Sequence, residues 1–394
     1  MKLLFTHRYF WPDTAPYGVI LKSIVGHFAQ TDNAVHVFAS KLSYRELGAD
    51  APAEMDGVDI RRCWVFQENK KNPITRAINV LLYCIGLFFH VLRLRPDVVT
   101  ASTFPPVLAA WSGSLAARIV GAKFVYHMMD IHPDVSQISG GLLGRAPIAN
   151  VLRWLDNHTL RRASAIVVLS QDMANTLAGR GLGALPIHVI NNFMLDSDEA
   201  QDPPREWVKD ANKKRVIFAG NLGRFQNLPL LAEGVATCFD THSDLELMFL
   251  GDGAALSELR TRWGDHPQVT FAPFLPFAQA KALIADADVG LVSLNRDIYR
   301  VAYPSKMLTY LGLGVPVLAL VEPESALAEE VSANGLGAVP EAATAEAIGV
   351  ALRKVLGAGG SPALVKSWYT SKATKDVAMN HWEAVLDALR EDRG

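Results

Sequence analysis

Residues 215–223 read RVIFAGNLG, a short β-branched and aromatic run that closes on two glycines. A run too short for a helix and ended by a glycine turn predicts a buried strand that leads through the turn into a helix. Residues 245–253, LELMFLGDG, repeat the pattern. Two such units in succession predict a parallel sheet whose carboxyl edge carries ligand-binding turns.

The same alternation of short apolar runs and longer helical patterns extends in both directions from this stretch. It predicts strands at 215–220, 245–250, 269–272, 289–294 and 315–320, and before them at 2–9, 34–39, 58–65, 97–101, 123–129, 165–170 and 188–193. Strands that alternate with helices are typical of the α/β class. We therefore expect two doubly wound, Rossmann-like parallel-sheet domains in tandem.

A polar, proline-containing stretch at 196–214 separates the two halves and predicts a linker. The expected N-terminal domain is then 1–195 and the expected C-terminal domain 215–370. A last helix at 371–394 places apolar residues on one face and can pack against either domain. The length of 394 residues agrees with two domains.

Composition excludes several classes of protein. Half of the residues are hydrophobic, which excludes a disordered or fibrous chain. The three cysteines show no C-x-x-C spacing, so we expect neither a disulfide framework nor a zinc site, and we expect a reducing compartment. The N-terminus lacks the apolar core of a signal peptide, which indicates a cytoplasmic location.

Charge is unevenly distributed along the chain. Residues 1–195 contain 19 Lys and Arg against 13 Asp and Glu, and residues 196–394 contain 19 against 27. The first half is basic without a Lys/Arg tract, which argues against nucleic-acid binding and favours an anionic membrane surface or a phosphorylated ligand.

The run 77–92 contains no formal charge and is flanked by cations. As a helix it would span about 24 Å, less than the roughly 30 Å of a hydrocarbon core, so we do not predict a transmembrane segment. Two interpretations remain open: a buried helix beside the sheet, or a helix in the membrane interface that exposes Phe88, Phe89 and Leu92.

Two turns in the first half are candidate sites. In the turn at 8–18, Gly18 could open a helix whose free amides face an anion. The turn at 126–134 follows a strong strand and contains His127, Asp130 and His132. These side chains could ligate a metal, have a structural role, or supply charge and hydrogen bonds to a reacting group, and we favour the last interpretation.

The second half contributes two more candidate turns. The first is the glycine-rich pair that opened this section, where Arg224 offers donors matched to phosphate. The second, at 296–310, combines three cations with Pro304, which at a helix start should leave the following amides free for an anion. The predicted donor-side residues are Gly220, Asn221, Gly223, Arg224, Gly251, Asp252, Gly253, Phe274, Arg300, Ser305, Lys306, Met307 and Thr309.

These pieces together resemble a family-four glycosyltransferase of the GT-B fold, in the branch of bacterial exopolysaccharide, capsule and O-antigen sugar transferases. The resemblance is carried, in the family's order and over nearly the whole chain, by YFWP at 9–12, D-x-x-PD at 130–134, GNLG at 220–223, GDG at 251–253, and PSK at 304–306 through GVPV at 314–317.

The resemblance implies retaining transfer from a nucleotide-sugar, by default a UDP-sugar, without a required cofactor or metal. It implies a donor in the C-terminal domain, an acceptor held by the N-terminal domain, and a cleft between them. With the basic N-terminal half, it implies a lipid-linked (polyprenyl diphosphate) saccharide acceptor and a peripheral position on the cytoplasmic face of an anionic inner membrane. Arg224 and Lys306 would grip the donor diphosphate, and Asp130, His127 and His132 would border the acceptor hydroxyl.

The chain departs from the family where many members carry two glutamates, because Val301 and Thr309 occupy those positions. Thr309 could still bond a ribose or sugar hydroxyl. Two other classes of protein stay open: a sugar-nucleotide epimerase of the same fold, and a non-catalytic membrane-associated assembly subunit.

Overall fold

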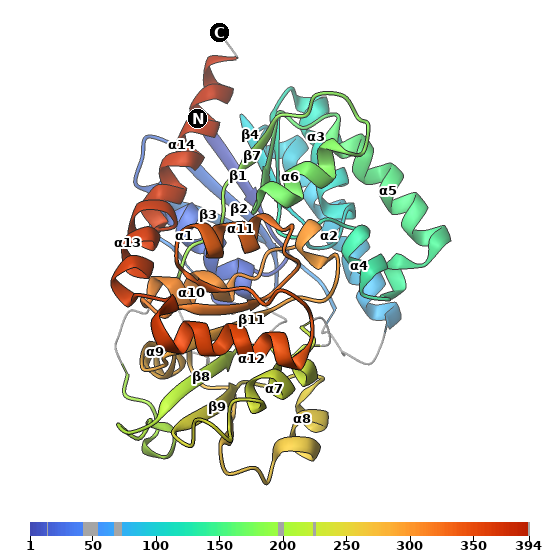
Figure 1. Cartoon of the computed structure of the whole chain (residues 1–394). Coiled ribbons are helices and arrows are strands. Elements are labelled where there is room, and N and C mark those ends of the chain that lie inside the picture. Colours follow the sequence, from blue (N-terminus) through green and yellow to red (C-terminus); the bar gives the residue numbers. More distant parts are fainter. Residues whose placement is uncertain (14, 42–53, 67–72, 196–200, 224–225, 393–394) are drawn as a thin grey trace. The chain divides into compact units, whose positions relative to one another are not determined.

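The structure is a computed structural model that describes all residues except 14, 42–53, 67–72, 196–200, 224–225 and 393–394. The chain divides into two compact units (Figure 1). Unit 1 comprises residues 1–191 together with 378–394, and unit 2 comprises residues 192–377. The divisions fall a few residues from the expected boundaries at 195 and 371, and the last helix returns to unit 1.

Unit 1 is built on a seven-stranded sheet in the order β3-β2-β1-β4-β5-β6-β7. The register places Phe5 beside Val37 on one side and beside Thr100 on the other, and each neighbouring pair is parallel. The strands are β1 (Lys2–Thr6), β2 (Ala34–Ser40), β3 (Val58–Cys63), β4 (Val98–Ser102), β5 (Lys123–Met128), β6 (Ala165–Val168) and β7 (Ile187–Val189).

Helices connect these strands. They are α1 (Pro16–Ala29), α2 (Pro73–Leu94), α3 (Leu108–Val120), α4 (Asp134–Ile138), α5 (Ala146–Leu160) and α6 (Gln171–Ala178), with a short 3-10 turn η1 (Leu142–Gly144). The last helix of the chain, α14 (Lys375–Glu391), adds to unit 1 from residue 378 on. α2 packs on α3, and α3 packs on α5. Nε2 of His27 on α1 and Oε1 of Glu383 on α14 are hydrogen-bonded at 2.8 Å. This contact connects the last helix of the chain to the first.

α2 is longer than the uncharged run that predicted it. Among the described residues it is the one helix whose length and composition would allow it to cross a membrane, and 28% of its most apolar window is buried. Tyr83, Leu87 and Val91 are fully buried, and the Phe38 ring of β2 stacks on His90 at 4.9 Å. α2 therefore packs on the sheet along its length, while its other face stays exposed.

Unit 2 repeats the arrangement with a six-stranded parallel sheet in the order β10-β9-β8-β11-β12-β13. Its strands are β8 (Lys214–Ala219), β9 (Leu245–Leu250), β10 (Val269–Ala272), β11 (Val289–Ser293), β12 (Val317–Leu320) and β13 (Gly337–Ala338). The α/β prediction of two doubly wound sheets is thus confirmed. The sequence pattern did not predict β13, because two residues are too short for a periodic signal.

Both faces of this sheet are covered by helices. α7 (Leu228–Ala236), α8 (Leu256–Trp263) and α12 (Ala345–Lys354) contribute to the core on the face of Val216 and Phe218. α9 (Phe277–Ala285), α10 (Lys306–Gly312), α11 (Ala326–Ala333) and α13 (Pro362–Lys372) contribute to the core on the face of Ile217 and Ala219. The remaining short turns are η2 (Arg205–Trp207), η3 (Ile298–Arg300) and the π-helical η4 (Val355–Gly359).

The strand orders define where ligands can bind. In each sheet the direction of winding reverses once, between β1 and β4 in unit 1 and between β8 and β11 in unit 2. Ligands of doubly wound sheets bind outside the carboxyl ends of the strands at such a reversal. The predicted turns at 8–18 and 220–223 follow β1 and β8, so each begins at one of these points.

Candidate functional site

The turns after β8 and β9 in unit 2 come into very close contact. Gly251 has φ +136°, and a Cβ on it would lie 2.0 Å from the carbonyl oxygen of Gly220. Gly253 has φ +159°, and a Cβ there would lie 2.4 Å from the carbonyl oxygen of Leu222. Both positions therefore require glycine. The backbone amide of Leu222 donates to the Asp252 carbonyl at 2.9 Å, which holds the two turns together.

The predicted donor residues of these turns differ in exposure: Gly251 is buried, and Gly223 and Gly253 are half-buried. Gly220 and Asn221 are exposed, as is Asp252, whose Oδ1 accepts the Gly253 amide at 2.7 Å. The amide of Gly223 donates to Oε1 of Gln226 at 3.1 Å. Arg224 lies outside the described residues.

Lys306, the first residue of α10, has a buried ammonium group. Its Nζ lies 3.3 Å from the centroid of the Phe218 ring on β8, a cation–π contact. The Nζ atom has no hydrogen-bond partner among the described residues. Burial lowers the pKa of Lys306 from 10.5 to about 7. A buried ammonium without an acceptor is costly, and such a group is typical of a site that receives an anion.

Ser293 ends β11, the strand next to β8 at the reversal. It is 2% exposed, and its Oγ has no hydrogen-bond partner among the residues described. Val289 pairs with Val216, so alternation places Leu291 and Ser293 on the face of the sheet that Phe218 occupies. Nζ of Lys306 and Oγ of Ser293 are thus two buried polar atoms of this region without partners among the described residues: Ser293 ends β11, and Lys306 starts α10 and contacts Phe218 on the neighbouring strand β8. Ser293 was not predicted, because a serine at the end of an apolar strand gives no signal of its own.

The structure places the other predicted residues of unit 2 in differing environments. Arg300 is exposed and pairs with Asp297 at 3.2 Å, and its Nε donates to the Tyr299 hydroxyl at 3.1 Å. Phe274 and Ser305 are exposed, and Thr309 is half-buried.

One expectation about these residues is wrong. The Met307 amide is not free, because it donates to the Pro304 carbonyl at 3.0 Å, and the Met307 side chain is fully buried in the core. Pro304 starts a turn that satisfies this amide before the helix begins. This bond removes Met307 alone from the amides expected to be free, and the Lys306 cation stays as a group that the segment offers to an anion.

Gly18 lies in the first turn of a helix, as expected, but it is not the residue at which the helix begins. α1 begins at Pro16, and Gly18 is its third residue. A Cβ on Gly18 would lie 2.7 Å from the carbonyl oxygen of Tyr9, so the glycine allows α1 to pack closely on the turn after β1. Its local role is close packing.

His127, near the end of β5, belongs to a buried chain of neutral rings in unit 1. The Tyr17 hydroxyl and His127 Nδ1 are hydrogen-bonded at 2.8 Å, and the Trp382 ring of α14 packs against His127 at 4.9 Å. His7 contacts Tyr17 at 4.7 Å between ring centroids and bonds Ser102 at 2.6 Å. Burial lowers the pKa of His127 to about 3, so the ring stays neutral at physiological pH.

Asp130 and His132 follow the same strand but are less deeply enclosed. The carboxylate of Asp130 has no hydrogen-bond partner in the described part of the chain, and burial raises its pKa from 3.8 to about 6. Burial lowers the pKa of His132 to about 4, and its Nδ1 lies 3.4 Å from the Ser136 hydroxyl. Asp134 is already paired with Arg180 at 2.6 Å and Arg153 at 3.1 Å. Asp130 is therefore the carboxylate of this turn that can receive a hydrogen bond from a ligand.

Two parallel-sheet α/β units in tandem agree with the predicted GT-B fold. The predicted resemblance is confirmed, since residues 17–192 match the glycosyl transferase 4-like domain. The chain is accordingly a glycosyltransferase of the GT-B fold that carries a glycosyl transferase 4-like domain in its first half.

Relatives and solved structures agree with this assignment. The chain is 24% identical over 301 residues to "Probable glycosyltransferase WbjE" of Pseudomonas aeruginosa, which covers 74% of each chain. It is 22% identical over 317 residues to WcaI of Escherichia coli (strain K12), named as a colanic acid biosynthesis glycosyl transferase, which covers 77% of each. The crystal structure of Anabaena HepE in complex with UDP superposes with a TM-score of 0.68 at 16% identity, covering 98% of this chain and 100% of that one.

Proposed function

We propose that this glycosyltransferase transfers a sugar, with retention, from a UDP-sugar to a lipid-linked saccharide in bacterial surface polysaccharide assembly. The observation that carries the proposal is the buried ammonium of Lys306, which has no acceptor among the described residues. The names of the relatives support the pathway class, and the UDP in the HepE structure supports the nucleotide.

The donor diphosphate would bind at the β8/β11 reversal of unit 2. There the exposed turn at Gly220 allows close backbone approach, and the Ser293 hydroxyl and Lys306 ammonium can each donate to a phosphate oxygen. Negative charge builds on the leaving nucleoside diphosphate in the transition state. A cation preplaced in a site of low dielectric stabilises that charge more strongly than it would in water.

The acceptor would bind at the carboxyl end of β5 in unit 1. The Asp130 carboxylate can accept a hydrogen bond from the attacking hydroxyl and orient it. We infer retention by departure and attack on one face of the sugar, with the leaving phosphate taking the acceptor proton. The acceptor-side residues then position the hydroxyl. His127 is buried below them and contributes by packing rather than by contact with the acceptor.

The experiment measures release of nucleoside diphosphate from UDP-, GDP- and dTDP-sugars, with a polyprenyl diphosphate-linked monosaccharide as the acceptor probe. We compare Lys306→Ala with Lys366→Ala, a control that removes an exposed lysine of α13 in the same unit. Loss of one charge-assisted contact in the transition state should lower turnover about 100-fold or more in Lys306→Ala alone.

Three outcomes would contradict the proposal. Wild-type turnover in a folded Lys306→Ala variant would remove the assigned role of this cation. Conversion of a UDP-sugar without release of UDP would indicate an epimerase. Nucleotide binding without any donor turnover would indicate a non-catalytic subunit.

A further inference from the structure

One face of α2 is apolar and exposed to solvent. Its members recur at helical spacing: Ile74, Ile78, Leu81, Ile85 and Phe89, with exposed fractions of 70, 41, 56, 55 and 63%. The opposite face already supplies the core residues Tyr83, Leu87 and Val91. One apolar face is enough to pack a helix on the core, so packing does not explain the second, exposed apolar face of α2. Large exposed apolar patches mark interaction surfaces.

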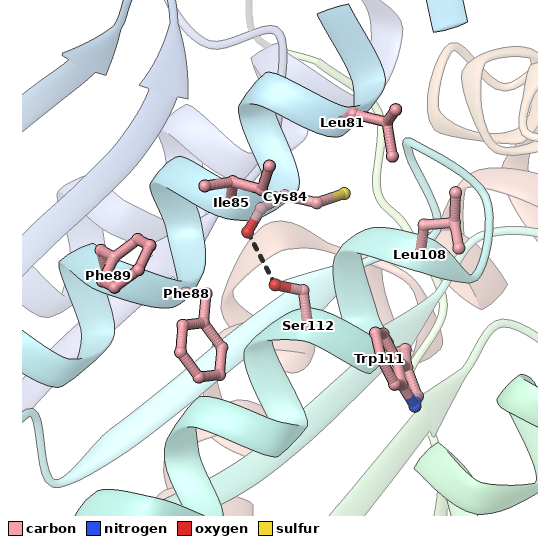
Figure 2. A pocket seen from close by; sticks show the side chains of 8 residues that line it. All are labelled: Leu81, Cys84, Ile85, Phe88, Phe89, Leu108, Trp111 and Ser112. Atoms are coloured by element: carbon pink, nitrogen blue, oxygen red, sulfur yellow. Dashed lines mark hydrogen bonds between the residues drawn. The ribbon is translucent and has the colours of Figure 1, made fainter. Parts of the chain in front are cut away.

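A groove runs between this face and α3 (Figure 2). It encloses about 240 Å³ and is lined by Leu81, Ile85, Phe88, Leu108, Trp111 and Ser112. Figure 2 shows the lining side chains that α2 and α3 contribute. The volume is below the roughly 300–1,000 Å³ of sites for drug-sized ligands, so a nucleotide-sugar would not be enclosed here.

The lining of the groove offers almost no hydrogen bond to a ligand. The hydroxyl of Ser112 donates to the Cys84 carbonyl at 2.7 Å, the bond drawn in Figure 2. Burial raises the pKa of the Cys84 thiol to about 12, so the thiol stays neutral. A polar ligand would lose its hydrogen bonds to water without replacement, whereas a hydrocarbon chain would not.

The charges on these two helices have one sign. Arg76 and Arg93 are exposed near the two ends of α2, and Arg118 is exposed on α3. Residues 73–94 and 108–120 contain no Asp or Glu. Arginine side chains beside an apolar helix face can reach anionic headgroups while the apolar residues enter the acyl region.

We propose that α2 and α3 form a membrane-docking face, with α2 lying in the interface of an anionic bilayer and the groove holding one acyl chain of a phospholipid. The positive charge favours a bilayer over a protein helix as the occupant, because anionic headgroups complement it. The inference extends the lipid-linked acceptor of the proposed function, but it stands on a surface that shares no residue with the donor site. Its failure would therefore leave the assignment of Lys306 untouched.

Flotation with vesicles of phosphatidylcholine, with and without phosphatidylglycerol, tests the docking face. Ile85→Asn with Phe89→Ser removes two exposed side chains, and Val350→Asn with Leu364→Ser removes two of similar exposure, 56 and 58%, from unit 2. We expect binding to anionic vesicles to fall about tenfold or more in the first pair only. Equal binding of both pairs, or equal binding to neutral vesicles, would overturn the proposal.

The cations are tested separately. Arg76→Gln and Arg93→Gln should each weaken binding to anionic vesicles about fivefold, and added salt should weaken wild-type binding in the same direction. UDP binding measured on every variant keeps the proposal falsifiable. A variant that loses vesicle binding but keeps its affinity for UDP is still folded, and the substitution has then disrupted the docking face alone. Vesicle binding that does not depend on salt would contradict the proposed role of the arginines.

The groove itself is tested with a water-soluble, short-chain phosphatidylglycerol below its micelle concentration. Leu108→Trp should fill the groove and abolish binding of this probe, while leaving vesicle flotation in place. Unchanged probe binding in Leu108→Trp would overturn the acyl-chain assignment. So would a wild-type preference for a short-chain polyprenyl phosphate over the phospholipid, which would assign the groove to an isoprenoid.

Discussion

The ammonium nitrogen of Lys306 lies 3.3 Å from the centre of the Phe218 ring, and no acceptor among the described residues bonds it. The aromatic face compensates only part of the hydration that the cation loses on burial. The folded protein therefore holds a buried cationic group that none of its described residues neutralises. Stability and function then make opposite demands on this position, as they do at many active sites.

Lys306→Met should stabilise the apo protein by about 1–3 kcal/mol at pH 7, because it removes a buried cation and keeps the apolar stem. The pKa of Lys306 is lowered on folding from 10.5 to about 7, so between these values the unfolded state binds more protons. The free energy of unfolding of the wild type should therefore rise with pH across this window relative to the variant. Urea unfolding of both proteins at a series of pH values measures the difference; parallel curves would contradict the buried, unpaired cation.

Nucleotide affinity should depend on the same proton. A bound diphosphate favours the charged lysine and raises its pKa, so binding takes up a proton above about pH 7. The dissociation constant for UDP should increase by up to about tenfold per pH unit above 7 in the wild type. Calorimetry in buffers of different ionisation enthalpy measures both effects. In Lys306→Met the affinity should be weaker and should lack this pH dependence.

Ser293→Ala separates ligand binding from stability. The hydroxyl has no partner among the described residues, so its removal should leave the stability of the apo protein unchanged or slightly raised. Loss of a hydrogen bond to a charged phosphate should weaken UDP binding about 10- to 100-fold. Ser257→Ala, which removes an exposed serine of α8, is the control. Equal UDP affinity in the two variants would exclude Ser293 from the site.

The contact between the turns after β8 and β9 is tested by Gly251→Ala. The added Cβ would lie 2.0 Å from the Gly220 carbonyl at a φ of +136°, so the two turns must separate. We expect a loss of about 3 kcal/mol or more in stability, with weakened UDP binding. Gly335→Ala, at φ +64° with open space around the Cβ, should lose only about 1–2 kcal/mol. Similar losses in thermal unfolding for both variants would show that steric contact is not what fixes glycine at 251.

The fold could be predicted from the sequence because fully buried parallel strands such as β6, which reads AIVV, are continuous hydrophobic runs. Gly220 and Gly251 could be named for the same reason, since each follows a predicted strand, whereas Lys306 was named from Pro304 and the cations of its turn. Long-range packing could not be read in this way. His127 is covered by Trp382, which lies near the opposite end of the chain. A local sequence pattern does not predict such a contact.

Asp130 differs from His127 in remaining able to receive a ligand, and its titration should be visible in two ways. Burial raises the pKa of Asp130 from 3.8 to about 6, so the folded state binds more protons than the unfolded state within that window. The free energy of unfolding of the wild type should fall with rising pH there, and Asp130→Asn should be more stable by about 1–3 kcal/mol at pH 7. In transfer to the polyprenyl diphosphate-linked probe, wild-type activity should decline below about pH 6 as the carboxylate is protonated. The variant should be about 10- to 100-fold slower and should not show this decline at low pH.

His188→Asn, which removes a half-buried histidine of β7, is the control for altering a titratable group in the same sheet. The stability measurement needs no acceptor, so it reports the raised pKa of Asp130 independently of transfer. A change in stability without a change in transfer would show that Asp130 has no role in the reaction. Another group would then have to orient the acceptor hydroxyl.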